Sequence, residues 1–212
     1  MDKKFCIFDM DGTLVDSMPA WKALGRNYLE ERGFHPTQEQ LAIMTPMTME
    51  EGTAYLMDTF GIKGPPERIV RDMEEIMERR YRTDIPLKPG AADYLAALEA
   101  KGVRMCVATA TAEPLARICL ERLGIARYLE FILSCETVGV GKTAPRVYLE
   151  AARRLGAAPA NTAVFEDAFY AARTAKKAGF YVVGIPEATY DAHWPQLSAL
   201  ADETILDWRN AL

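Results

Sequence analysis

The stretch KFCIFDMDGTLVDS, residues 4–17, decides the fold, because a short apolar run leads directly into a group of acids. Residues 4–8 have the apolar and aromatic character of a buried strand. Asp9 and Asp11 follow two positions apart, so both side chains lie on the same side of an extended chain. Gly12 then permits a sharp turn. The sequence therefore predicts a strand whose carboxyl end carries two acids.

Further apolar runs of the same kind alternate with segments of helical periodicity. They are RMCVAT (104–109), FILSC (131–135), TAVFE (162–166) and YVVGI (181–185). Strands that alternate with helices predict a parallel sheet covered on both faces. We therefore expect an α/β fold with a doubly wound, Rossmann-like core. In such sheets, ligands bind outside the carboxyl ends of the strands.

A long insertion separates the first two predicted strands. Residues 9–103 intervene, far more than one crossover helix needs. Helical periodicity at residues 21–29 and 69–81, with a GIKGPP break between them, predicts an inserted all-helical cap over residues 16–86. Residues 1–15 and 87–212 would then form the core. The two linkers would lie side by side and could act as a hinge.

Polar residues follow the other predicted strands as well. Thr109 and Ala110 end the second strand, Lys142 follows the third after a short loop and is expected to open a helix, and Glu166 and Asp167 end the fourth. Because these ends share one edge of a parallel sheet, the side chains should converge with Asp9 and Asp11. The sequence therefore predicts a site of several carboxylates and one ammonium.

Charge repulsion within such a site predicts a bound metal. Converging carboxylates raise one another's pKa, and a divalent cation relieves the repulsion. Mg²⁺ prefers oxygen ligands and commonly uses one or two carboxylates together with a substrate phosphate. The candidate metal-binding residues are Asp9, Asp11, Glu166 and Asp167. Of these, Asp9 and Asp167 are the expected direct ligands, with Glu166 acting through water or from the outer shell.

The same residues fit phosphoryl-transfer chemistry. Asp9 could attack phosphorus as a nucleophile and form an acyl phosphate. Asp11 could protonate the leaving oxygen and later take a proton from water. The Thr109 hydroxyl, backbone N–H groups around Ala110 and the Lys142 ammonium would bind the phosphate oxygens. These residues are therefore the candidate catalytic and substrate-binding set.

Each motif alone has a simpler explanation. A DxD pair or a strand-end threonine often caps a helix, a single lysine is often solvated, and Glu166 with Asp167 could face a helix N-terminus. The GVGKT stretch (139–143) is similar to a nucleotide-binding P-loop, but Glu136 stands where that loop needs a glycine. The combination at successive strand ends favours the phosphate site over these separate explanations.

The chain resembles hydrolases of the haloacid dehalogenase (HAD) superfamily, in the subgroup that includes phosphoglycolate phosphatase and β-phosphoglucomutase. The resemblance covers nearly the whole chain and rests on FDMDGTLVDS (8–17), VATAT (107–111), GKTAPRVYLE (141–150) and FEDAFYAARTAKKAGF (165–180). It implies a helical cap, dependence on Mg²⁺, an aspartyl phosphate on Asp9 and acid–base catalysis by Asp11. LKPGA (87–91) resembles the return from cap to core.

We therefore expect a Mg²⁺-dependent phosphatase, a phosphoric monoester hydrolase, acting on a small phosphorylated metabolite. A phosphomutase of the β-phosphoglucomutase type and a non-catalytic phosphate-binding relative remain alternatives. The chain departs from its relatives at four positions. Thr143 and Arg146 replace a proline and an acid, while Ala168 and Ala171 replace a serine and a glycine. These departures could alter loop geometry without removing a charged side chain.

Net charge and the length of the apolar runs limit the kinds of partner that the chain is expected to bind. The formal net charge is -5, which argues against a general nucleic-acid binder. No run approaches the length of a membrane span, so a soluble, cytoplasmic protein without a membrane partner is expected, as a monomer or weak homodimer.

The single cysteines are expected to be buried thiols. His35 and His193 are expected at the surface. The methionines of MTPMTMEEGTAYL (44–56) are expected to fill a core.

Overall fold

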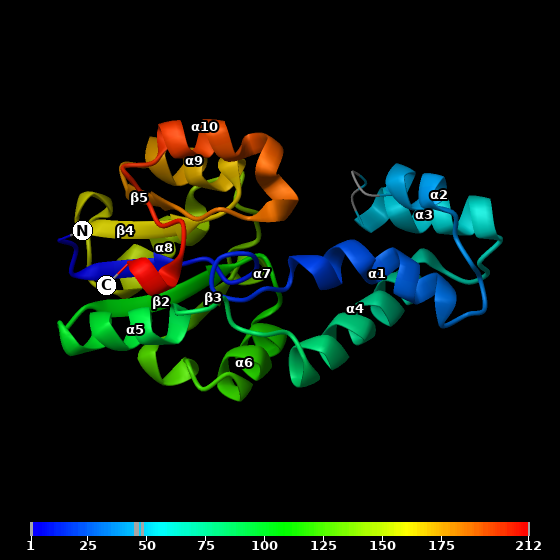
Figure 1. Ribbon diagram of the computed structural model, residues 1–212, viewed down its shortest axis with the longest axis horizontal. Coiled ribbons are helices and arrows are strands. Elements are labelled where there is room, and N and C mark those ends of the chain that lie inside the picture. The colour runs from blue at the N-terminus through cyan, green and yellow to red at the C-terminus, as the bar shows by residue number, and fades with distance from the viewer. Residues whose placement is uncertain (1, 45–46, 48, 212) are drawn as a thin grey trace. The chain divides into compact units, whose positions relative to one another are not determined.

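The computed structural model describes residues 2–44, 47 and 49–211 (Figure 1). The chain divides into two compact units. Met1–Ser17 and Ile85–Leu212 form an α/β core, and Met18–Asp84 form a helical cap. The helical region thus lies between the first and second strands of the core. Each unit is described by itself below.

The core is built on a parallel sheet, which confirms the predicted α/β class. Among the described residues the strand order is β3-β2-β1-β4-β5-β6, and every pairing is parallel. The bounds are β1 Phe5–Phe8, β2 Arg104–Thr109, β3 Ile132–Ser134, β4 Thr162–Glu166, β5 Tyr181–Gly184 and β6 Glu203–Thr204. The short edge strand β6 was not predicted. The chain reverses its winding beside β1, so the carboxyl ends of β1, β2 and β4 meet at the switch point.

Helices cover the sheet on both faces (Figure 1). The α-helices of the core are α5 Ala91–Ala100, α6 Glu113–Arg122, α7 Cys135–Val138, α8 Arg146–Arg154, α9 Phe169–Lys177 and α10 Trp194–Leu200. Short 3-10 helices occupy Ala126–Tyr128, Pro159–Asn161, Ala188–His193 and Trp208–Asn210. Helices α6 and α8 end before Gly124 and Gly156, each with a positive φ, as is common where glycine ends a helix.

The two faces of β1 and β4 pack differently. Ile7 and Val164 belong to a mainly aliphatic core with side chains of α8 and α9, which also contains the rings of Tyr148 and Phe180. Phe8 and Phe165 belong to an aromatic layer, with ring centroids 4.2 Å apart and Trp208 beside them. The Trp208 indole also donates a hydrogen bond to the Thr13 carbonyl at 3.2 Å. This contact ties the loop after β1 to the C-terminal part of the core.

The cap is built from α1 Met18–Glu30, α2 Gln38–Met44, α3 Met49–Phe60 and α4 Pro66–Thr83. Its interior is formed by the residues whose spacing predicted the first and last of these helices, among them Leu24, Tyr28, Met73 and Tyr81. The Trp21 indole donates to the Tyr81 hydroxyl at 3.1 Å and joins α1 to α4. Sequence periodicity did not indicate α2, which has no fully buried residue.

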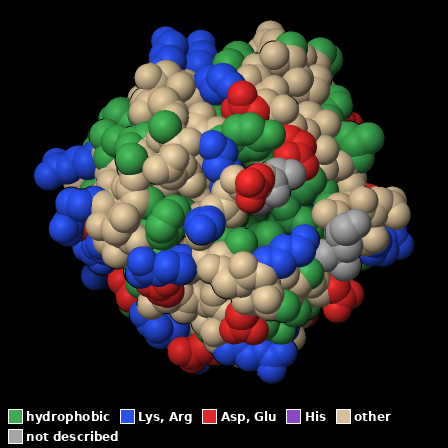
Figure 2. All heavy atoms as spheres, turned by 90° about the vertical axis from the view of Figure 1, so that its left-hand side faces the viewer, with side chains coloured by type: hydrophobic (Ala, Val, Ile, Leu, Met, Phe, Trp, Pro, Cys, Tyr) green, Lys and Arg blue, Asp and Glu red, His purple; other side chains and the backbone are tan. Residues whose placement is uncertain are grey.

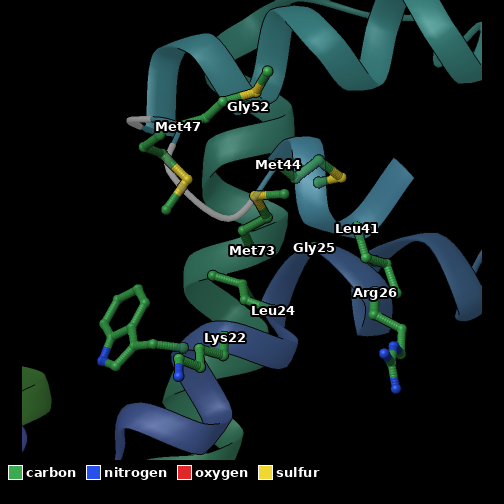
Figure 3. A pocket seen from close by; sticks show the side chains of 11 residues that line it. Lys22, Leu24, Gly25, Arg26, Leu41, Met44, Met47, Gly52 and Met73 are labelled. Carbon is green, nitrogen blue, oxygen red and sulfur yellow. The ribbon is translucent and has the colours of Figure 1, made fainter. Parts of the chain in front are cut away.

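The cap also contains a pocket of ≈ 300 Å³ (Figure 3). Its lining includes Met44, Met47, Met49 and Met73, and Figure 3 shows Met44, Met47 and Met73 among the side chains around it. The expectation that the methionines of residues 44–56 fill a closed core is wrong for these side chains, because Met44 and Met47 are only half-buried and Met49 is 37% exposed. Thr45, Pro46 and Thr48 of this segment lie outside the described residues.

The remaining expectations concern thiols, histidines and surface charge. All four cysteines are buried and free, and both histidines are exposed, as predicted. On the face shown in Figure 2, basic and acidic side chains are interspersed over the surface. Within the described part of the chain, no helix is both long and apolar enough to cross a membrane.

Candidate active site

The loop after β1 carries Asp9 into the centre of the sheet edge. The Asp9 backbone N–H donates to the Phe165 carbonyl at 3.0 Å, so Asp9 continues the pairing of β1 with β4. Gly12 has φ 85, and its N–H donates to the Val15 carbonyl at 2.9 Å. This left-handed turn is strained for other residues, which accounts for glycine at this point. Asp9 is therefore held in a buried position at the carboxyl edge of the sheet.

Asp11 is held by two hydroxyl groups. Ser17 Oγ donates to Asp11 Oδ1 at 2.6 Å, and Thr111 Oγ1 donates to Asp11 Oδ2 at 2.7 Å. Ser17 comes from the end of the same loop, whereas Thr111 follows β2. The Asp11 carboxylate is therefore oriented by both neighbouring segments and remains partly exposed.

Lys142 lies in a turn four residues before α8, so the prediction that it opens a helix is wrong. Gly139, in a left-handed conformation, ends α7 just before this turn. The Lys142 side chain is 5% exposed and its ammonium donates to Asp9 Oδ1 and to Glu166 Oε1, the latter at 2.7 Å. The lysine therefore joins acids from the ends of β1 and β4.

Three buried acids form a group that could hold a metal ion. Ligand oxygens of Asp9, Glu166 and Asp167 all lie within 4.8 Å of one another. Thr13 Oγ1 donates to Asp167 Oδ1 at 3.4 Å, while the buried Asp167 Oδ2 has no hydrogen-bond partner. A buried carboxylate oxygen without a donor is costly, and a cation at this point would satisfy it.

Charge also fits a divalent ion. Three carboxylates and the Lys142 ammonium leave two negative charges in a buried space. Among the described residues, Asp11 is not a member of this group of three, so its expected part in metal binding stays a prediction.

The electrostatics of the metal-free site favour proton uptake by the acids. Burial raises the pKa of Asp9 to about 7, although the Lys142 charge opposes the shift and Glu166 adds to it. Burial, together with the Asp9 charge, also raises the pKa of Asp167 well above its ordinary value. For Lys142, burial alone would lower the pKa, but the charges of Asp9 and Glu166 outweigh it and raise the pKa. The lysine therefore remains an ammonium.

The end of β2 supplies the remaining predicted residues. Thr109 is buried, and its hydroxyl oxygen accepts a hydrogen bond from the Thr111 backbone N–H at 3.0 Å. Ala110, next to it, is exposed. The structure therefore joins Asp9 directly to Lys142 and, through that lysine, to Glu166. It links Asp11 to the segment after β2 through Thr111.

Sequence reasoning did not identify four polar partners: Thr13, Ser17, Thr111 and Tyr148. Thr13 and Ser17 lie within the DGTLVDS stretch, and Thr111 lies two positions after Thr109, so their nearness to the acids was a usable signal. Tyr148 lies on the buried face of α8, where a tyrosine ordinarily serves packing. Its hydroxyl nevertheless donates to Glu166 Oε1 at 2.7 Å.

The four positions that depart from the family motif lie in or beside regular helices and turns of the core. Ala168 precedes α9 and offers no side-chain cap, while Ala171 is fully buried within that helix. The Thr143 carbonyl accepts a hydrogen bond from the Thr174 hydroxyl at 3.4 Å, which links the Lys142 turn to α9. Arg146 is the first residue of α8. None of these replacements removes a charged side chain of the acid group.

The chain is similar to several known proteins. It is 30% identical to the phosphorylated carbohydrates phosphatase of Thermotoga maritima over 82% of this chain and 80% of that protein. It is 28% identical to the phosphoglycolate phosphatase of Salmonella typhimurium, over 94% and 86% of the two chains. A solved structure of a candidate β-phosphoglucomutase from Thermotoga maritima superimposes with a TM-score of 0.86, at 27% identity over 98% and 97% of the chains.

The acids, Lys142 and the helical insertion between β1 and β2 all lie in the part of the chain that a family comparison covers. Residues 3–179 match the family of haloacid dehalogenase-like hydrolases. This range contains β1 to β4, the cap and every residue of the acid group. The predicted resemblance is confirmed, and the chain belongs to the haloacid dehalogenase-like hydrolase family.

Proposed function

We propose that this chain is a Mg²⁺-dependent phosphatase that hydrolyses a small phosphorylated metabolite through an aspartyl phosphate on Asp9. One observation carries the proposal: the buried group of Asp9, Glu166 and Asp167 with Lys142 in contact and one carboxylate oxygen unpartnered. This arrangement combines a nucleophile, a cation site and a phosphate-binding ammonium at one point of the sheet edge.

In the first half of the reaction, an Asp9 carboxylate oxygen attacks phosphorus. The bond from phosphorus to the leaving oxygen breaks, and Asp11 donates a proton to that oxygen. The hydroxyls of Ser17 and Thr111 hold Asp11 in place for this transfer. The product is an aspartyl phosphate and a free alcohol.

In the second half, Asp11 takes a proton from water as the water oxygen attacks phosphorus. The bond between phosphorus and the Asp9 oxygen breaks, which restores the carboxylate and releases inorganic phosphate. Lys142 and the donors around Thr109 and Ala110 would hold the phosphate oxygens as charge moves between them. The ammonium already touches Asp9, so it lies where that charge develops.

Asp9 and Asp167 would hold Mg²⁺ directly, with Glu166 in its outer shell. When bound, the ion would neutralise the acids and polarise the phosphoryl group. The unpartnered Asp167 Oδ2 and the excess of negative charge support this assignment.

The names of similar proteins indicate a substrate class. They include a phosphorylated carbohydrates phosphatase, a fructose-1-phosphate phosphatase and a hexitol phosphatase. We therefore propose a phosphorylated sugar or a similarly small phosphate ester as the substrate. A phosphomutase is the second candidate, because the candidate β-phosphoglucomutase superimposes over nearly the whole chain.

The decisive experiment measures phosphate release from sugar phosphates, phosphoglycolate, nucleotides and an aryl phosphate, with Mg²⁺ or EDTA. Asp9→Asn should lower turnover by at least about 10⁴-fold, since it removes the nucleophile. Asp16→Asn is the matched control, because Asp16 is an exposed aspartate seven positions along the same loop. Isomerised sugar phosphate without phosphate release would favour the mutase. No reaction with any compound would overturn both enzymatic functions.

A further inference from the structure

Glu166 receives two hydrogen bonds on one oxygen. Lys142 Nζ and the Tyr148 hydroxyl each donate to Glu166 Oε1, both at 2.7 Å. All three side chains are buried. Two donors on Oε1 fix the plane of the carboxylate, and the second oxygen, Oε2, then points away from both donors. The orientation of this acid is therefore set by its partners and not by solvent.

Tyr148 reaches Glu166 from the interior of the core. It is the third residue of α8, its side chain is 0% exposed, and its ring lies 6.2 Å from that of Phe180 in an edge-on arrangement. The Lys142 ammonium lies 5.9 Å from the centre of the Tyr148 ring. A phenylalanine would fill the same space and keep both ring contacts. Packing therefore accounts for the aromatic ring at this position but does not account for its hydroxyl group.

We infer that Tyr148 is a positioning residue for the metal site, acting through its hydrogen bond to Glu166. Lys142 is shared between Asp9 and Glu166, so it cannot neutralise both acids fully. The Tyr148 hydroxyl supplies a second donor to Glu166 without adding charge. It thereby keeps Glu166 from drawing the ammonium away from Asp9, and holds Glu166 beside the two acids proposed as direct ligands.

Removal of the hydroxyl should therefore weaken metal binding. Loss of a hydrogen-bond partner of a direct ligand typically lowers metal affinity by about 10-fold to 100-fold. Tyr148 acts one contact further from the ion, because its partner Glu166 is proposed for the outer shell, so the low end of this range applies. For Tyr148→Phe, we expect a rise of about 10-fold in the Kd for Mg²⁺. The Mg²⁺ concentration that gives half-maximal turnover should rise by the same factor.

The test measures Mg²⁺ binding by calorimetry on the full chain without substrate, and Mg²⁺ activation of phosphate release in parallel. Tyr94→Phe is the matched control. Tyr94 is another buried core tyrosine, it packs against Phe165, and its ring is part of the aromatic face of the sheet. This control should bind Mg²⁺ as the wild type does. Equal Mg²⁺ affinity in wild type and Tyr148→Phe would overturn the inference.

A second variant separates positioning from general packing. In a Glu166→Gln background, Tyr148→Phe should change the Mg²⁺ Kd much less than in the wild type, because the two residues act as one unit. A purely structural tyrosine would lower thermal stability and leave the Mg²⁺ Kd unchanged in both backgrounds. An undiminished effect in the Glu166→Gln background would also contradict a role through Glu166.

The inference rests on the metal site of the proposed function, and the two can fail separately. If the wild type binds Mg²⁺ and the tyrosine variant binds it less tightly, Tyr148 has the inferred role even when no tested ester is hydrolysed. If the wild type hydrolyses esters with Mg²⁺ and the variant shows the same Mg²⁺ dependence, only the role of Tyr148 is lost. Absence of Mg²⁺ binding in the wild type would overturn both.

Discussion

The acid group of the core and the pocket of the cap differ in how their side chains are held. In the core, Asp9, Lys142 and Glu166 are buried and joined by short charged contacts. In the cap, the half-buried Met44 and Met47 and the exposed Met49 lie with the buried Met73 around an open space, and methionine side chains have several rotatable bonds. The core therefore fixes the geometry that the proposed chemistry needs, whereas the cap offers a surface that can adapt.

Among the variants that test this contrast between core and cap, replacement of the Lys142 ammonium should have the largest effect on turnover. Lys142→Met would leave the buried acids without their cation, and loss of the proposed phosphate contact should reduce turnover on the order of 10²-fold to 10³-fold. Metal-free stability should fall by about 3 kcal/mol, because one partner of a buried pair is removed. Urea denaturation with and without Mg²⁺ measures the free energy of unfolding, and added Mg²⁺ should restore part of the lost stability.

The control for this variant is Lys176→Met. Lys176 pairs with Asp202 at the surface, where each side chain is about a third exposed. Surface pairs contribute less than about 1 kcal/mol, so stability and turnover should stay close to wild type. Equal losses in the two variants would remove the distinction between the buried and the exposed lysine.

Two glycines extend the comparison to backbone packing. Gly90 in the core has φ 87, and an added Cβ would lie 2.6 Å from the Arg209 backbone nitrogen. Gly90→Ala should therefore cost about 2 kcal/mol or more. Gly25 lies inside helix α1 of the cap, where an added Cβ would meet the terminal methyl of Met44. That methyl can move, and alanine favours the helix by about 1 kcal/mol.

Thermal denaturation of the two alanine variants tests whether the cap tolerates added volume. We expect Gly25→Ala to be as stable as the wild type or slightly more stable, and Gly90→Ala to be clearly less stable. A large loss in Gly25→Ala would show that Met44 is held rigidly, and the contrast between a fixed core and an adaptable cap would fail at this point.

The raised pKa of Asp9 predicts that the stability of the core depends on pH. Burial raises this pKa from 3.8 to about 7 in the metal-free fold. The folded protein then keeps a proton that the unfolded chain has already lost, so this contribution to stability is full below about pH 4 and is lost as pH rises to about 7. Asp9→Asn removes the titration.

The measurement is the difference in unfolding free energy between wild type and Asp9→Asn, from pH 4 to pH 8 without metal. Wild type should lose stability relative to the variant across this range. Stabilisation of the wild type by Mg²⁺ should grow over the same range, because metal binding displaces the proton. A difference that does not change with pH would mean that Asp9 is already ionised in the metal-free fold.

The smallest expected effect comes from the cap pocket. Met49 is 37% exposed, so Met49→Ala should change stability by less than about 0.5 kcal/mol. Met105 is the matched residue of the core, buried in β2, and Met105→Ala should cost about 2–5 kcal/mol. Similar values for both variants, measured by urea denaturation, would contradict the structural difference between the two regions.

The sequence predicted the sheet because its strands carry a local signal. The apolar runs at residues 104–109 and 162–166 coincide with β2 and β4, and the acids directly follow β1 and end β4. Lys142 was predicted near these acids, and its ammonium contacts two of them. The expectation that it opens a helix failed, because α7 and the turn after it occupy the segment before α8.

Other features depend on contacts that no local pattern records. Helix α2 has no fully buried residue, so its sequence lacks the periodic apolar face that identifies a helix. Strand β6 is short and pairs only at the sheet edge. Tyr148 has the spacing of a packing residue, and only the fold brings its hydroxyl to an acid eighteen positions away. Periodicity predicts which face is buried, but it does not predict a polar atom at the end of an apolar ring.

The distribution of sulfur gives the two regions different sensitivities to oxidation. Seven of the ten methionines lie in residues 18–84, and that segment contains no cysteine. The four thiols are all buried in the core, where burial raises the pKa of Cys6 to about 12 and of Cys119 to about 11, so little reactive thiolate forms. A mild peroxide treatment should therefore convert the thioethers of the cap pocket to polar sulfoxides before it reaches any thiol. Oxidative damage would begin in the cap and leave the catalytic core intact.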